Sequence, residues 1–153
     1  MAKTLRAGDT ISGREGRAYA KINGNNEELF YLKSIEATVE KAKAEIKALG
    51  RRMTGHKTTG ENGSGSVAMY YMSPLFRSLL LQYHKTGQDL FFDIVVENAD
   101  LTSAAGKQTV LLRDCNLDST VLAKLDADSD DPMDEEMDFT FEDYDILTPF
   151  NAI

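Results

Sequence analysis

A glycine-rich stretch between residues 50 and 58 comes within one inserted residue of a phosphate-binding loop. Gly50 and Gly55 have the required spacing, but His56 stands between the second glycine and Lys57. A nucleotide-binding loop places its lysine directly after that glycine and then opens a helix, whose backbone N–H groups surround the phosphates. Residues 59–66 contain three glycines, which disfavour a helix. We therefore expect no bound nucleotide at this stretch.

A second stretch, residues 126–130, begins like a calcium-binding loop with three alternating aspartates. Such a loop needs glycine at its sixth position and glutamate at its twelfth, and these positions hold Asp131 and Met137. Residues 126–145 contain 11 acidic side chains and no basic one. We expect a solvated acidic turn between strands, with incidental binding of divalent cations as the alternative.

Catalytic and metal-binding groups are few. The two histidines, His56 and His84, and the lone Cys115 cannot form a zinc site without several carboxylates. No Ser/His/Asp or Cys/His grouping stands out. Arg51 and Arg52 could contact phosphates, but two arginines in so acidic a chain do not predict binding to duplex DNA. We expect no enzyme, no cofactor and no metal.

Length and composition indicate one globular domain, which would span residues 1–153. The apolar fraction of 42% is ordinary for a folded protein. The first residues lack the apolar segment of a signal peptide, and no apolar run approaches the roughly 20 residues of a membrane span. A single cysteine suits a reducing cytoplasm. We expect a soluble protein that is made inside a cell and does not contact a membrane.

The net charge of −8 is unevenly distributed. Residues 1–57 hold 12 basic and 7 acidic side chains, a balance of +5, whereas residues 58–153 hold 5 and 18, a balance of −13. Opposite charges on two parts of a chain can bring identical subunits together. The alternative is that folding mixes the two sets in space.

Most of the chain alternates apolar and polar residues with the period of a β-strand. The expected strands are residues 11–22, 29–39, 67–72, 89–97, 109–117, 120–128 and 137–142. Asn23-Gly24, a strong hairpin signal, follows the first strand. In the last two strands the inward side chains would be Val121, Ala123, Leu125 and Ala127, then Met137, Phe139 and Phe141.

One helix is indicated over residues 73–86. Ser73 is a good N-cap, Pro74 suits the first helical position, and Gly87 can end the helix. Apolar side chains at 76, 79, 80 and 83 form one helical face, which must pack on another element. The residues together predict a mainly β fold with one flanking helix.

Residues 40–50 leave two interpretations open. Their alanines, lysines and glutamates favour a helix that ends at Gly50. A strand is the alternative, but its apolar positions would have to change from odd to even numbers, as at a bulge. Residues 50–66 that follow are polar and glycine-rich, and they predict a long loop.

Five segments resemble the tail tube proteins of contractile phages of Gram-positive bacteria and of related prophage particles. They are residues 11–17, 36–41, 50–60 (Gly-Arg-Arg-Met-Thr-Gly-His-Lys-Thr-Thr-Gly), 125–130 and 139–145. The resemblance covers nearly the whole chain in order, and residues 50–60 are its most specific part. It implies a β-barrel or sandwich with one flanking helix (about residues 73–86) and a long hairpin or loop (about residues 33–72). In that fold residues 33–49 form a strand that pairs with residues 65–72, so the resemblance decides against the helix.

The resemblance also implies a structural subunit that assembles into hexameric rings, which stack into the inner tube of a contractile tail and conduct DNA. It implies a virion or a phage-like particle that is assembled in the host cytoplasm, with tail sheath, baseplate and tail terminator proteins as further partners. The contacts between rings are expected at Arg51, Arg52, Thr54, His56, Lys57 and Thr58. Acidic residues within 126–145 would receive them, and Lys41, Lys43 and Lys47 would be paired or turned away from a negative channel.

Two alternatives remain at the level of the sequence. The chain could form the tube of a bacteriocin-like or secretion particle, which shares the fold. From a different class, a small calcium- or nucleotide-binding module would fit the two imperfect motifs described above.

Overall fold

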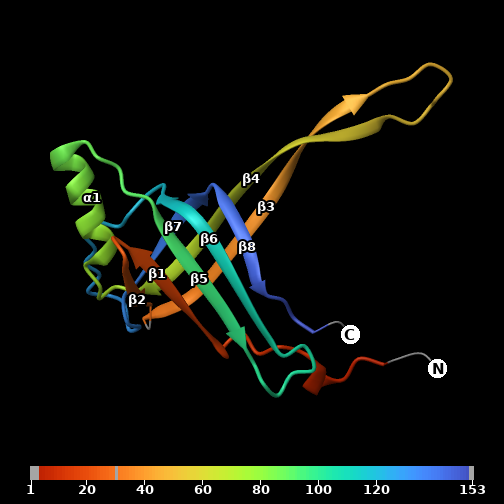
Figure 1. The fold of residues 1–153 in the computed structure, drawn as a ribbon. Helices are drawn as coiled ribbons and strands as arrows, with labels where there is room; N and C mark the ends of the chain where they lie inside the picture. Colours follow the sequence, from red (N-terminus) through yellow and green to blue (C-terminus); the bar gives the residue numbers. More distant parts are fainter. Residues whose placement is uncertain (1–3, 30, 152–153) are drawn as a thin grey trace.

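The computed structural model describes residues 4–29 and 31–151, and these residues form a mainly antiparallel β fold (Figure 1). In chain order the elements are a short 3-10 helix (Ala7–Asp9), β1 (Gly16–Ile22), β2 (Asn25–Glu28), β3 (Leu32–Ile46), β4 (Gly55–Tyr70), α1 (Leu75–Thr86), β5 (Phe92–Ala99), β6 (Lys107–Leu117), β7 (Asp134–Phe141) and β8 (Asp143–Thr148). The strands neighbour one another in the order β2-β1-β5-β6-β7-β4-β3, and β8 also pairs with β6. The expected mainly β fold with one helix is confirmed.

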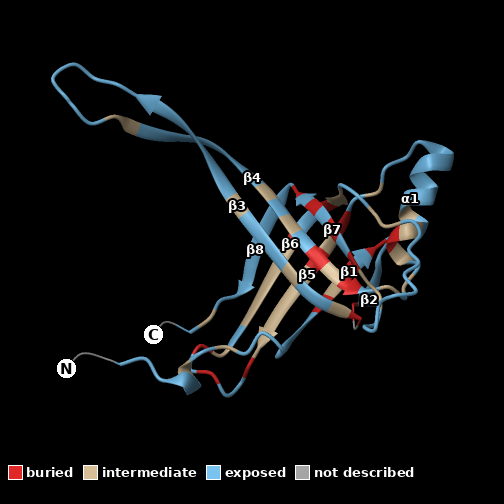
Figure 2. Cartoon of the chain, turned by 180° about the vertical axis from the view of Figure 1, so that it is seen from behind, coloured by how far each residue is buried: buried red, intermediate tan, exposed pale blue. Residues whose placement is uncertain are grey.

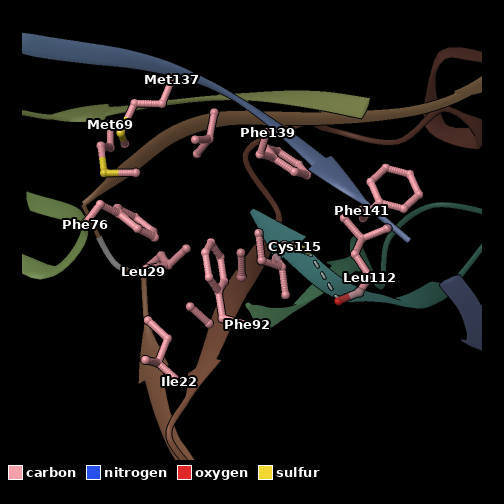
Figure 3. Packing of buried hydrophobic residues seen from close by; sticks show 14 of the residues in the cluster. Ile22, Leu29, Met69, Phe76, Phe92, Leu112, Cys115, Met137, Phe139 and Phe141 are labelled. Carbon is pink, nitrogen blue, oxygen red and sulfur yellow. Dashed lines mark hydrogen bonds between the residues drawn. The ribbon is translucent and has the colours of Figure 1, made fainter. Parts of the chain in front are cut away.

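Strand β6 connects two layers and so creates the core between them. Most of β6 lies between β5 and β8, while its last residues, Asn116 and Leu117, pair with β7. Aromatic and sulfur-containing side chains from both layers and from α1 fill the space between them (Figure 3). The rings of Phe76 on α1 and Phe92 on β5 have centroids 5.7 Å apart. The predicted inward side chains of β7 (Met137, Phe139 and Phe141) are all buried.

The helix and the first hairpin lie where the sequence predicts them, but the N-cap of α1 is Pro74 rather than Ser73, and the helix begins at Leu75. The backbone N–H of Leu75 donates to the Ser73 hydroxyl (3.3 Å), and Gly87 ends α1 with φ 74° and an N–H bond to the carbonyl of Tyr83. Asn23 and Gly24 both have positive φ, 51° and 82°, as the turn of a tight hairpin requires. The first strand begins at residue 16 rather than at residue 11.

The predicted strand over residues 120–128 is wrong. Residues 118–133 form no helix or strand, and the side chain of Leu125, expected to face inward, is 98% exposed. Side chains fasten this segment to the body instead: Lys124 Nζ donates to the carbonyl of Asp134 (2.7 Å), and Arg77 Nη1 to that of Val121 (3.4 Å). Aspartates are depleted in strands, and the dense run of them after residue 125 outweighs the alternating pattern.

Two glycines of β4 make room for the aromatic rings of β7. A methyl group on Gly65 would lie 2.5 Å from the ring of Phe139 and 2.5 Å from the backbone carbonyl oxygen of Glu36. Gly63 has the same relation to the ring of Phe141, at 2.4 Å. Contacts this short force the sheet or the ring to move.

We expect Gly65→Ala to lower the free energy of unfolding by about 1–3 kcal/mol, the usual cost of overpacking a well-filled site. Urea titration followed by circular dichroism measures the change. Gly60→Ala is the matched control, since a methyl group there would meet nothing within 4 Å, and it should unfold as the unaltered chain does. Equal stabilities of the two variants would show that the β4–β7 contact adapts without cost.

The loop between β5 and β6 is tied to the amino-terminal segment by the buried carboxylate of Asp100. It accepts bonds from the hydroxyl and backbone N–H of Thr102 (2.6 and 3.1 Å) and from the backbone N–H of Ser12 (2.9 Å). These donors, the Thr102 hydroxyl first among them, hold the pKa of Asp100 below its ordinary value. The charged carboxylate is therefore the form that stabilises the loop.

Asp100→Asn should melt at a lower temperature than the unaltered chain at neutral pH, and the difference should shrink in acid. Because the pKa is lower in the folded chain, the stabilisation is complete above the unfolded pKa of about 3.9 and is lost as the pH falls through the folded value. Melting curves recorded between pH 7 and pH 2 test this. A gap in melting temperature that stays constant over this range would contradict the assigned role of the charge.

Candidate assembly site on the β3–β4 hairpin

The longest hairpin of the chain projects beyond the body of the protein (Figure 1). β3 and β4 pair from Leu32↔Met69 to Ile46↔Gly55, whereas β7 pairs with β4 only between Gly63 and Tyr70. Beyond that point residues 40–62 form a two-stranded ribbon with almost all side chains exposed, as Figure 2 shows. The long hairpin predicted for residues 33–72 is confirmed.

The predicted loop over residues 50–66 is largely wrong. Only residues 47–54 connect the two strands, and β4 already begins at Gly55. The polar and glycine-rich residues 55–66 are a strand because every one of them except Thr59 has a partner on β3, and this pairing satisfies their backbone hydrogen bonds. The same pairing makes residues 40–46 a strand, against their helical propensity, and β3 ends at Ile46 rather than at residue 49.

A bulge lies at the predicted place in the hairpin, but it is on β4 and not on β3, so it does not change which face the side chains of β3 occupy. The register shifts between Ala42 and Lys43, with Thr59 as the extra residue on β4, and the Thr59 hydroxyl donates to the carbonyl of Ala42 (3.1 Å). Since β3 itself continues without an extra residue, its side chains keep alternating. Ala42 and Ile46 therefore lie on the opposite face of the sheet from Val39, which packs against the core.

The base of the projecting ribbon is braced by β8. The hydroxyl of Tyr144 donates to Glu61 Oε2 (3.0 Å), and its ring meets that of Phe141 nearly at a right angle with centroids 6.3 Å apart. Hydrogen bonding to the Glu61 carboxylate raises the pKa of Tyr144. β8 was not predicted from the sequence, and its contacts fix the direction in which the ribbon leaves the body.

The structure brings all six predicted contact residues together on the outer half of the hairpin. Arg51, Arg52 and Thr54 lie in the connecting loop, and His56, Lys57 and Thr58 begin β4. Sequence reasoning missed the exposed apolar side chains among them: Ile46 is 51%, Leu49 105% and Met53 77% exposed. Three large apolar residues in an otherwise polar stretch were the available signal.

The acidic residues lie at the other end of the same sheet. Tyr70, the last residue of β4, pairs with Asp134, the first residue of β7, and residues 126–131 immediately precede that strand. Lys33 Nζ contacts Asp134 Oδ2 at 2.6 Å, and this bond holds the pKa of Asp134 below its ordinary value. Four further aspartates, at positions 126, 128, 130 and 131, form no ion pair within the described chain.

The two imperfect motifs do not form ligand sites. Gly55 to Thr58 lie in a strand, so their backbone groups belong to a β-ladder and not to a helix N-terminus that could hold phosphate. Over the described residues no three His, Cys, Asp or Glu side chains are grouped closely enough to hold a metal ion.

Burial raises the pKa of the Cys115 thiol to about 12, which makes it unreactive. Within residues 4–29 and 31–151 no helix is long and apolar enough to cross a membrane.

Chains of two solved assemblies have the same fold as this chain. One chain of the anti-feeding prophage baseplate superposes with a TM-score of 0.66 at 14% identity, covering 96% of this chain and 97% of that one. A chain of the sheath–tube complex of an extracellular contractile injection system gives a TM-score of 0.64 at 10% identity, covering 90% and 91%. These likenesses define the fold class.

The family is defined by sequence. The family model described as phage tail tube protein matches residues 3–148, and this chain belongs to that family. It is 44% identical over 142 residues to the phage-like element PBSX protein XkdM of Bacillus subtilis strain 168, with 93% of each chain covered. The chain is thus a structural tail tube subunit and not an enzyme. It is a component of a phage tail or phage-like particle.

Proposed function

We propose that the chain assembles into hexameric rings, and that the rings stack into the inner tube of a contractile tail and conduct DNA. The observation that carries the proposal is the two-stranded ribbon of residues 40–62, which pairs with no further strand within residues 4–29 and 31–151 and is held at its base only by the β8 brace. The baseplate that contains a similarly folded chain is sixfold symmetric, which supports a ring of six.

Physical reasons favour neighbours around that ribbon. An isolated two-stranded hairpin is only marginally stable in water, and the 15-residue β3 presents an open edge along its length. Pairing with strands of adjacent subunits would satisfy that edge and continue the sheet into a closed barrel. Contacts of Arg51, Arg52, Thr54, His56, Lys57 and Thr58 would then join one ring to the next.

The outer face of β3, β4 and β7 suits the wall of a DNA channel. The alternation of side chains places four acidic residues on this face, together with serine and threonine hydroxyls: Glu36, Glu40, Glu136 and Asp138. Between positions 34 and 40 of β3, this face carries no basic side chain. Lys41 and Lys43 have the other parity and would point away from the channel, whereas Lys47 lies beyond β3 in the connecting loop. Each lysine or arginine on a phosphate adds affinity, so an acidic wall lets DNA slide.

The partners would be the sheath, baseplate and tail terminator of the same particle, assembled in the host cytoplasm. A similarly folded chain occurs in a sheath–tube complex, which supports the sheath as a neighbour. The second candidate is the tube of a bacteriocin-like or secretion particle, since one similarly folded chain comes from an extracellular contractile injection system. Protein cargo would then replace DNA.

Electron microscopy of the purified chain, together with size-exclusion chromatography, tests the proposal. Sixfold rings and tubes are expected as the protein concentration rises. A monomer at every concentration, with no rings or tubes on the grid, would refute it. Native particles with a DNA-filled head would favour the phage tube, and headless particles without DNA would favour the second candidate.

A further inference from the structure

The hairpin tip, residues 46–57, is a basic surface with exposed apolar side chains. It carries four basic residues (Lys47, Arg51, Arg52 and Lys57) and no acidic one. None of the four takes part in an ion pair within the described chain. Between them stand Leu49 and Met53, which are 105% and 77% exposed. Exposed apolar side chains surrounded by charges of one sign are typical of a contact surface.

The acidic end, residues 122–131, has the complementary composition. It carries four aspartates with no ion pair, at positions 126, 128, 130 and 131, and one basic residue, Lys124, which is bound to Asp134. Its two leucines are also exposed, Leu122 at 70% and Leu125 at 98%. Within the described chain, the four unpaired basic residues of the tip thus match four unpaired aspartates, and both surfaces carry exposed large apolar side chains: Ile46, Leu49 and Met53 on the tip, and Leu122 and Leu125 on the acidic end.

The two surfaces lie at opposite ends of the same strands. β4 runs from Gly55 at the tip to Tyr70, which pairs with Asp134 beside the acidic end. Its 16 residues at about 3.3 Å each separate the two surfaces by about 50 Å. A second copy displaced along the strand direction therefore brings its acidic end to the tip of the first. Such a contact is head-to-tail and repeats without limit, as a tube requires.

We propose that the hairpin tip of one copy docks on the acidic end of the next copy along the tube. The inference rests on the proposed function and names the receiving surface that a stacked ring presents. Arg51 and Arg52 bind the aspartates through bidentate hydrogen bonds. The exposed Leu49 and Met53 pack on the exposed leucines of the acidic end, Leu122 and Leu125. Glu142 and the acids of β8, Asp143 and Asp145, are not the receivers, because β8 lies beside the base of the hairpin and not at its far end.

Disulfide trapping tests the contact directly. A chain with Met53→Cys and Leu125→Cys carries both halves of a head-to-tail contact, so oxidised tubes should yield a ladder of dimers, trimers and longer chains on a non-reducing gel. Native Cys115 is fully buried and does not interfere. The matched control is Met53→Cys with Leu147→Cys, because Leu147 lies on β8 and is 54% exposed. The control should give no ladder.

Charge reversal supplies an independent readout. Arg51→Asp with Arg52→Asp should abolish tubes, Asp128→Arg with Asp130→Arg should abolish them as well, and the fourfold variant should regain at least half of the normal tube mass in sedimentation. Normal tubes that give no Met53–Leu125 ladder, or a ladder in the β8 control, overturn the inference and leave the proposed function standing. An unaltered chain that forms no rings or tubes refutes the proposed function and the inference with it.

Discussion

Chains carrying Arg51→Ala together with Arg52→Ala are expected to fold and melt like the unaltered chain and to form few or no tubes. Both side chains are exposed at the end of the ribbon and form no ion pair in the described subunit, so the isolated fold loses little by their removal. In the assembly each arginine would meet carboxylates of a neighbour. A hydrogen bond to a charged group contributes about 1.5–3 kcal/mol, and the loss recurs at every subunit of every ring.

Thermal unfolding by circular dichroism and tube length by electron microscopy measure the two halves of that expectation. Arg14→Ala with Arg113→Ala is the matched control, since it removes two exposed arginines outside the hairpin and should leave tubes at normal length. If the Arg51 and Arg52 variant forms tubes of normal length at normal protein concentration, the tip is a solvated loop that contacts nothing.

Local patterns in the sequence predict those elements whose side chains decide the structure by themselves. The alternation of Met137, Phe139 and Phe141 places β7 correctly, because burial of those side chains requires that register. Ser73, Pro74 and Gly87 delimit α1 for reasons of local geometry. Asn23-Gly24 likewise sets its own turn.

The two principal errors have one physical cause, since a strand needs a partner that local sequence does not reveal. Residues 120–128 alternate well but find no neighbouring strand, and they stay irregular. Residues 55–66 are polar, rich in glycine and poor in β-formers, yet all but Thr59 pair with residues of β3. Residues 40–46 favour a helix by propensity, and only the family resemblance predicts the strand, because it carries information about the partner.

The sequence predicted where the basic residues of the candidate site lie, but it did not predict the exposed apolar side chains beside them. The charges of Arg51, Arg52 and Lys57 mark the hairpin tip, and the structure gathers them there. The exposure of Leu49 and Met53 was not predicted, because their position in a polar stretch indicates exposure only once the ribbon is known to project from the body. The separation of the tip from the acidic residues also depends on the β4–β7 register, which no local pattern encodes.

The remaining prediction with a large effect concerns Arg77, which ties α1 to the sheet. Glu135 belongs to the inward-facing set of β7, and its side chain is only 2% exposed. Arg77 Nη1 contacts Glu135 Oε2 at 2.6 Å, Nη2 donates to the carbonyl of Ser73, and the guanidinium lies 4.5 Å from the centroid of the Tyr71 ring. One side chain therefore satisfies a buried carboxylate and holds the start of the helix.

Arg77→Ala should lower the free energy of unfolding by about 3–5 kcal/mol, because it leaves the Glu135 charge buried without a partner. This is a large part of the roughly 5–15 kcal/mol that stabilises a typical domain, so the urea midpoint should fall sharply. Arg77→Met with Glu135→Leu removes both charges and should recover most of the loss, since an apolar pair of similar volume costs little. If Arg77→Ala and the double variant unfold at the same urea concentration, the stabilisation comes from the packing of the Arg77 side chain, including its contact with the Tyr71 ring, and not from its ion pair with Glu135.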